Sequence, residues 1–179
     1  MFDKDMQIHG KHARYWKSLA NLKGNAVVTA DNFKIFENYI HVYMVAPIIG
    51  LLNGRKAYEE DNDVIKDSAG MLAAIQIKYS SKLKYIYRLI ILTDDSEGLS
   101  AEEKINRAFR EDGNEESVKK GMELYEAYFR GGLEILYETF VEQCITDDDY
   151  IAKLYEFMSD FKQEQDIDSL SLDIDALLR

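Results

Sequence analysis

Residues 68–93 read SAGMLAAIQIKYSSKLKYIYRLIILT, and this stretch contains no aspartate or glutamate. The whole chain has 179 residues, 33 acidic residues and a formal net charge of −11, so a long interval without acids stands out. At 100° per residue, its larger apolar side chains fall within a band about 80° wide. These are Leu72, Ile75, Tyr79, Leu83, Ile86 and Ile90. The pattern predicts one helix from roughly Lys66 to Leu92, apolar on more than one side and therefore central.

The cations of this stretch lie on two sides of the predicted helix. Lys78 and Lys82 flank the apolar band, whereas Lys84 and Arg88 lie on the far side. A protein that follows a nucleic-acid backbone needs a single row of cations. The arrangement instead predicts an acidic neighbour on each side of a scaffold helix.

A second long helix is predicted from about Glu115 to Cys144, with apolar residues at spacings near three and four. Its Gly131-Gly132 pair costs roughly 1 kcal/mol per glycine relative to alanine. Such a pair predicts a close helix crossing or a kink.

Start and stop signals predict the remaining helices. Ser100 and Glu103 match a capping box, and Thr146 with Asp149 is a second candidate cap. A helix after Asp31 should kink or break at Pro47, because proline lacks an N–H and clashes with the preceding turn.

The fold class that follows is all-α, with five to seven helices around a central apolar helix. Only one proline occurs in the chain, and this scarcity favours long helices over a turn-rich β fold. We expect a single irregular helical domain over residues 1–162. Within it, residues 1–24 form a basic N-terminal arm and helix, and residues 163–179 follow as an acidic amphipathic tail.

Composition excludes several classes of protein. A pI near 4.8 disfavours general affinity for nucleic acid, because phosphates would be repelled. Cys144 is the sole cysteine, so an intramolecular disulfide is impossible. The first twenty residues lack the apolar core of a signal peptide, and the most apolar run, 39–52, is shorter than the about 20 residues of a membrane helix. We expect a cytoplasmic protein with no membrane association.

The basic N-terminus is the first candidate site. Residues 1–24 carry five lysines and arginines against two aspartates, a net of +3. Lys11, Arg14, Trp16 and Lys17 combine cations with an aromatic ring, which suits phosphate contact and base stacking. The alternative is that these cations pair internally with the acidic body and that Trp16 packs in the core.

The C-terminal tail is the second candidate. As a helix it would carry Ile167, Leu170, Ile174 and Leu177 along one narrow apolar edge, with Asp166, Asp168, Asp173 and Asp175 around it. This pattern is typical of a helix that docks in a groove. The groove could belong to a separate partner, to a second copy of the chain or to its own helical bundle. A tail without fixed structure is the remaining alternative.

Catalytic and metal-binding patterns are weak. The spacings of His9 with His12, and of Glu37 with His41, would suit a metal only if the two segments met, so these residues are best explained as ordinary polar side chains. The aspartates at 94–95 and 147–149 lie at predicted helix ends. There is no P-loop, nucleotide-binding glycine fingerprint or serine-hydrolase elbow, and Cys144 has no evident activating histidine. We therefore predict no enzyme activity and no cofactor.

The function predicted from these patterns is that of a non-enzymatic protein-interaction subunit in a larger cytoplasmic assembly. It would dock through its acidic surface and its C-terminal amphipathic segment, either to a protein partner or as a homo-oligomer. One alternative is an accessory protein that contacts nucleic acid through the basic N-terminal helix. Another is an acidic mimic of nucleic acid that inhibits a DNA-binding protein.

Overall fold

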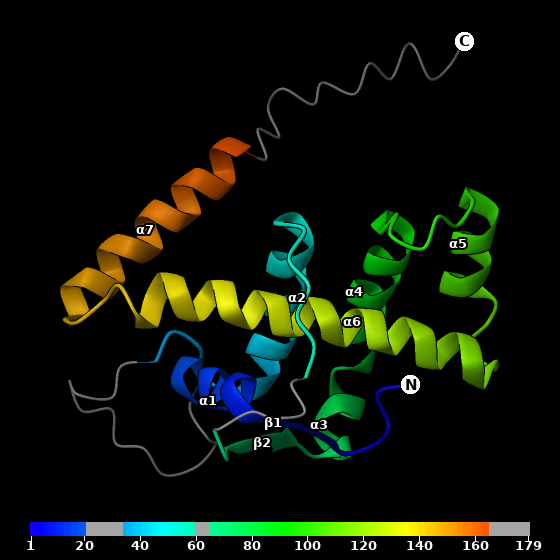
Figure 1. Ribbon diagram of the computed structural model, residues 1–179, viewed down its shortest axis with the longest axis horizontal. Coiled ribbons are helices and arrows are strands. Elements are labelled where there is room, and N and C mark those ends of the chain that lie inside the picture. Colours follow the sequence, from blue (N-terminus) through cyan, green and yellow to red (C-terminus); the bar gives the residue numbers. More distant parts are fainter. Residues whose placement is uncertain (21–33, 60–64, 165–179) are drawn as a thin grey trace.

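The computed structural model describes residues 1–20, 34–59 and 65–164, which form one mostly helical body (Figure 1). The helices are α1 (Gly10–Leu19), α2 (Tyr39–Leu52), α3 (Ala73–Lys78), α4 (Ser80–Thr93), α5 (Ala101–Phe109), α6 (Glu115–Leu136) and α7 (Asp147–Glu164). Two short strands, β1 (Met6–His9) and β2 (Ser68–Met71), pair in antiparallel fashion. The predicted all-α class is confirmed. The predicted domain limit at residue 162 stays a prediction, and Asp31 lies outside the described residues.

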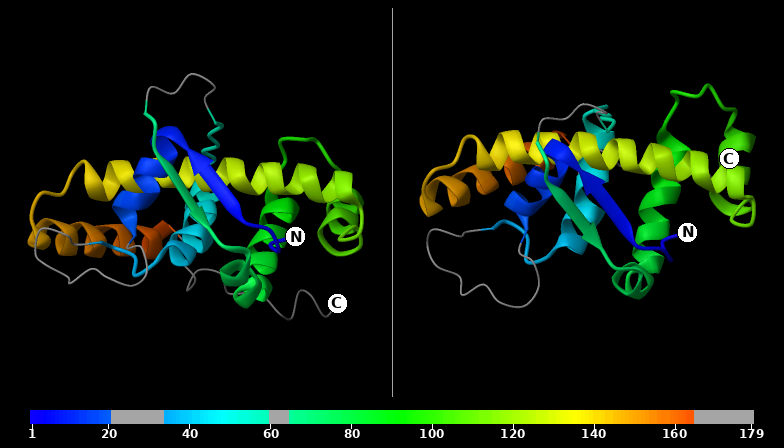
Figure 2. Two further views of the ribbon diagram at one scale, coloured as in Figure 1. Left: turned by 90° about the horizontal axis from the view of Figure 1, so that it is seen from below. Right: turned by 60° about the horizontal axis from the view of Figure 1, so that its bottom comes forward.

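The central element is α6, with α1, α2 and α4 packed along it (Figures 1 and 2). It continues directly into one π-helical turn at Tyr137–Val141, so the long helix predicted from about Glu115 is confirmed over most of its length. Its start is fixed by Asn114, whose side-chain oxygen accepts hydrogen bonds from the backbone N–H groups of Glu116 and Ser117 at 3.1 and 3.2 Å. This cap offsets two of the unpaired donors at the helix start.

The single helix predicted over residues 66–92 is wrong. Ser68–Met71 is strand β2, and the rest divides into α3 and α4 at Tyr79. Ala69 and Met71 are buried while the residues beside them are exposed, so the local period is two rather than 3.6. The register pairs Gly70 with Gln7, and a Cβ atom at Gly70 would lie 2.6 Å from the carbonyl oxygen of Met6. Pairing with β1 therefore overrides the helical spacing of the apolar residues.

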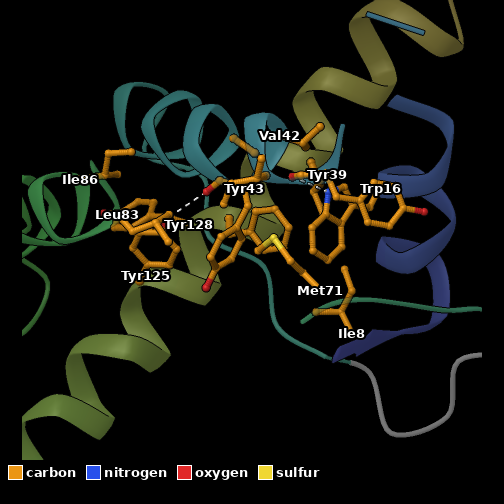
Figure 3. Packing of buried hydrophobic residues seen from close by; sticks show 14 of the residues in the cluster. Ile8, Trp16, Tyr39, Val42, Tyr43, Met71, Leu83, Ile86, Tyr125 and Tyr128 are labelled. Atoms are coloured by element: carbon orange, nitrogen blue, oxygen red, sulfur yellow. Dashed lines mark hydrogen bonds between the residues drawn. The ribbon is translucent and has the colours of Figure 1, made fainter. Parts of the chain in front are cut away.

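Pro47 does not break α2, which runs through this residue, and the predicted kink stays a prediction. Proline has no N–H to donate to the carbonyl oxygen four residues earlier, that of Tyr43. The buried hydroxyl of Tyr125 on α6 donates to this carbonyl oxygen instead, over 2.8 Å (Figure 3). A side chain from another helix thus satisfies the acceptor that Pro47 leaves unpaired.

Glycines allow α2 and α6 to cross with their backbones in contact. A Cβ atom at Gly132 would lie 1.8 Å from the carbonyl oxygen of Ala46, and one at Gly131 would lie 1.9 Å from that of Arg55. From the other side, a Cβ atom at Gly50 would lie 2.2 Å from the carbonyl oxygen of Tyr128. The close crossing predicted from the glycine pair is confirmed.

Aromatic side chains fill the core around this crossing (Figure 3). The fully buried Trp16 of α1 stacks on Tyr39 with ring centroids 4.7 Å apart and meets Phe129 edge to face at 5.1 Å. Its indole N–H donates to the carbonyl oxygen of Tyr39 at 3.2 Å, so the one polar atom of this side chain is satisfied. The core therefore ties α1 to both crossing helices.

Candidate interaction surface

The last helix, α7, begins with a reciprocal cap. The Asp149 carboxylate accepts hydrogen bonds from the backbone N–H groups of Thr146 and Ile145 at 2.8 and 3.1 Å, and the Thr146 hydroxyl accepts one from the N–H of Asp149 at 3.3 Å. These bonds to Thr146 and Ile145 hold the pKa of the Asp149 carboxyl below its ordinary value. The predicted cap is confirmed, and it sets the direction in which α7 leaves the body.

Only one edge of α7 packs on the rest of the protein. Phe157 meets Phe140 of the π-helical turn edge to face, with ring centroids 5.5 Å apart, and Tyr150 is also partly buried. Figure 1 shows α7 joined to the body near the C-terminal end of α6 and diverging from it. The helix is therefore anchored at its first turn, through Tyr150, and just past its middle, through Phe157.

The apolar arc of α7 is far wider than this anchored edge. At 100° per residue, its apolar side chains span about 160° of the helix circumference. Exposure rises steadily across the arc away from the body. The exposed fractions are 37% for Phe161, 41% for Leu154, 58% for Met158, 62% for Ile151 and 78% for Tyr155. We call these five residues the α7 face.

The opposite side of α7 is acidic. The helix sequence contains six acidic residues, including Asp149, Glu156 and Asp160, and two lysines, so its net charge is −4. At 100° per residue these three acids lie roughly opposite the α7 face. The helix thus presents a bare apolar surface on a strongly negative element.

The four residues predicted to contact nucleic acid lie on α1, and three of them are paired with acids. Lys11 lies 3.3 Å from Glu134, and Lys17 and Arg14 lie 2.7 and 3.6 Å from Asp67. Trp16 is fully buried. Its ring cannot stack on a base in this structure.

The predicted docking residues of the tail lie outside the described part of the chain. These are Ile167, Leu170, Ile174 and Leu177. The helix that leads to them is α7.

His12 and His41 have ordinary structural partners. His12 is buried, with Nε2 3.1 Å from an Oε atom of Glu134, and its ring also meets Tyr15 edge to face. Burial lowers the pKa of His12 despite the raising effect of Glu134. His41 lies beside the ring of Tyr79 instead. Among residues 1–20, 34–59 and 65–164, no three His, Cys, Asp or Glu side chains form a group able to hold a metal ion.

An ion cluster at Arg55 escaped the sequence analysis. The Arg55 guanidinium donates to both carboxylate oxygens of Glu138 at 2.7 and 2.6 Å and through Nε to Glu134 at 3.0 Å. Burial raises the pKa of the Glu134 carboxyl, but His12 and Lys11 outweigh this and leave it below its ordinary value. The only available signal was the i,i+4 spacing of Glu134 and Glu138, which is common on solvated helices. The cluster anchors the segment after α2 to α6.

Asp94 forms another ion pair, and its own side chain is buried. It lies at the C-terminal end of α4, 2.7 Å from the ammonium group of Lys56, and accepts hydrogen bonds from the hydroxyls of Ser96 and Tyr128. Burial disfavours its charge, yet the bonds from Lys56, Ser96 and Tyr128 lower the pKa of Asp94 from 3.8 to about 2. Asp94 thus links the segment after α2 and the helix α6 to the C-terminal end of α4.

Replacing Asp94 by asparagine should lower the free energy of unfolding by about 2 kcal/mol at neutral pH, from the size of this pKa shift. A depressed carboxyl pKa stabilises the fold above the unfolded-state value of 3.8 and loses that effect as the pH falls through about 2. The difference between wild type and variant in urea denaturation should therefore shrink over that interval. Asp148→Asn, at an exposed position, is the control. A difference that does not change with pH would contradict the assignment.

The remaining candidate groups have structural surroundings. Asp95 pairs with Lys104 at 2.5 Å, and Asp147–Asp149 occupy the first turn of α7, where the helix dipole favours negative charge. Burial raises the pKa of the Cys144 thiol, which disfavours a nucleophilic thiolate. None of the helices in the described ranges is long and apolar enough to cross a membrane.

Comparison of the chain with protein-family models, with curated proteins and with solved structures finds no match. The uncovered apolar surface of α7 is therefore the feature on which a functional interpretation rests.

Proposed function

We propose that this protein is a non-enzymatic interaction subunit that uses the α7 face to bind a basic amphipathic helix of another protein. The observation that carries the proposal is the rise in exposure across one apolar arc, from the partly buried Phe157 to the 78% exposed Tyr155. Contiguous apolar surface of this kind on a soluble protein is typical of a binding site.

The shape of the α7 face suits a helical ligand. Ile151, Leu154, Met158 and Phe161 recur at spacings of three and four, so they form a stripe along the helix. A partner helix with the same spacing would pack against this stripe and bury apolar area worth roughly 25 cal/mol for each Å² removed from water. A helix-on-helix contact is the expected binding mode.

Charge favours a basic partner over a second copy of the chain. The net charge of −4 on α7 lies on a chain with a net charge of −11. Two copies brought together at α7 would place these negative charges against each other, whereas a basic helix would be attracted and oriented by them. The partner is therefore expected to carry lysine or arginine beside its apolar stripe.

The nucleic-acid alternative has less support. Lys11, Arg14 and Lys17 already have acidic neighbours, and Trp16 is committed to the core. A mimic of nucleic acid would bind its partner through carboxylates on its acidic surface. That role does not use the apolar stripe of α7.

The proposal can be tested with a synthetic amphipathic Lys/Leu helix and a scrambled peptide of identical composition. The full-length protein should bind the amphipathic peptide with a Kd at least about tenfold lower than that of the scrambled peptide, in fluorescence anisotropy. Ile151→Ser combined with Met158→Ser should remove this preference, because it breaks the apolar stripe. Ala152→Ser combined with Gln163→Ser, on another side of α7, is the matched control and should retain it.

Three outcomes would overturn the proposal. Equal binding of both peptides would show that charge alone acts, and undiminished binding by the Ile151→Ser, Met158→Ser variant would place the site elsewhere. Self-association of the wild-type protein in analytical ultracentrifugation, lost in that variant, would make a second copy the occupant of the α7 face.

A further inference from the structure

A second uncovered surface lies between α2 and α4, on the acid-free part of the chain. Met44 of α2 and Ser81, Lys82, Tyr85 and Ile86 of α4 line an open groove of about 370 Å³. The ring of Tyr85 is 71% exposed, and Ile86 forms part of the apolar floor. We call these five residues the α4 groove.

The two sides of α4 differ in how their cations are neutralised. Lys84 and Arg88 lie 3.9 and 3.6 Å from the carboxylate of Asp112, in the connection between α5 and α6. Lys82, on the groove side, is exposed and forms no ion pair with another described residue. In a chain of net charge −11, the α4 groove is a cationic and apolar surface.

We propose that the α4 groove is occupied by residues 165–179 of the same chain. This segment has the complementary chemistry. If it is helical, Ile167, Leu170, Ile174 and Leu177 form an apolar edge. Asp166 and Asp173 then lie on one side of that edge, and Asp168 and Asp175 lie on the other.

Length and position also fit this occupant. At 1.5 Å per residue, a helix over residues 165–179 would be roughly 22 Å long, so it would fill the groove beside Ser81–Ile86 and extend along the rest of α4, which is about 21 Å long. Figure 2 shows α7 on the same side of α6 as α2 and α4, with its C-terminal end toward α2. The segment that follows Glu164 therefore starts from a helix end directed toward α2, one of the two helices that line the groove.

This occupant separates the roles of the two C-terminal elements. The α7 face remains for an external partner, and the tail covers a surface of its own bundle. The inference does not depend on what binds α7, since it concerns different residues and a contact within one chain.

Hydrogen–deuterium exchange of the full-length protein, followed by mass spectrometry, tests the contact. Peptide fragments from residues 165–179 should exchange at least about tenfold more slowly than an unstructured peptide of the same sequence. Lys82→Glu and Tyr85→Ser should each reduce this protection. Lys119→Glu, at an exposed position on α6, is the matched charge-reversal control and should leave it unchanged.

A charge swap distinguishes direct contact from indirect disturbance. In the Lys82→Glu background, replacement of either Asp166 and Asp173 or Asp168 and Asp175 by lysine should restore protection of the tail. The pair that does so identifies the side of the tail that faces α4.

Several results would overturn the inference. They are a wild-type tail that exchanges like an unstructured peptide, protection that survives Lys82→Glu or Tyr85→Ser, and rescue by neither charge swap. Protection that rises with protein concentration would assign the groove to the tail of a second copy and would also overturn the intramolecular contact.

Discussion

Replacing Gly132 by alanine is expected to lower the free energy of unfolding by about 3 kcal/mol or more, at the upper end of the range for overpacked sites. The added methyl carbon would lie 1.8 Å from the carbonyl oxygen of Ala46. Both atoms belong to rigid helical segments, α6 and α2, so neither can move aside as a flexible side chain would. Relief requires the two helices to separate, which loosens the aromatic core on both sides of the crossing.

Gly113→Ala is the matched control for this substitution. A Cβ atom at Gly113 meets nothing within 4 Å, and its backbone is not in the left-handed region, so its stability should stay within about 0.5 kcal/mol of wild type. Chemical denaturation of both variants gives the comparison. If Gly132→Ala does not fold, it should lose the helical circular dichroism signal that Gly113→Ala retains. That loss would equally show a large destabilisation. Equal stability of the two variants would contradict the close crossing.

The second large effect is expected at Trp16, where replacement by alanine should cost about 3–5 kcal/mol. The variant loses the stacking on Tyr39, the edge contact with Phe129 and the hydrogen bond to the Tyr39 carbonyl oxygen. The resulting cavity would lie where α1, α2 and α6 meet, so the surrounding helices can collapse into it only in part.

Tyr155→Ala separates this core effect from the loss of an aromatic residue as such. Tyr155 is a large aromatic residue on α7, 78% exposed, and its removal should change stability by no more than about 0.5 kcal/mol. Thermal unfolding of the two variants beside wild type measures both effects. A small decrease in the free energy of unfolding for Trp16→Ala would mean that this side chain does not pack in the core. Base stacking by Trp16 would then again be a candidate role.

Signals within a few residues of sequence correctly predicted helix caps and the close helix crossing. The Ser100 hydroxyl accepts from the N–H of Glu103, whose carboxylate accepts from the N–H of Ser100 at 2.8 Å, as the capping box required. The glycine pair at 131–132 likewise indicated a close crossing. Without Cβ atoms, this part of a long helix allows another backbone to approach closely. Such features need no knowledge of the rest of the chain.

The acid-free stretch shows where sequence reasoning failed. Its apolar spacing fits a helix, but Ser68–Met71 lies beside Met6–His9, and the strand pairing between them depends on residues about 60 positions apart. The same limit applies to the interaction surface. The sequence predicted the cap at Thr146 and Asp149, yet the fraction of the apolar arc of α7 that the body covers depends on how α7 leaves Thr146.

Pro47 has a consequence for the order of folding. In isolation, α2 would leave the carbonyl oxygen of Tyr43 to water, and the protein donor that replaces water in the core, the Tyr125 hydroxyl, is 82 residues distant in sequence. The backbone of one helix is thus completed only when the other has docked. Burial of α2 in the core should therefore require its contact with α6, because water must leave the Tyr43 carbonyl oxygen only when the Tyr125 hydroxyl replaces it.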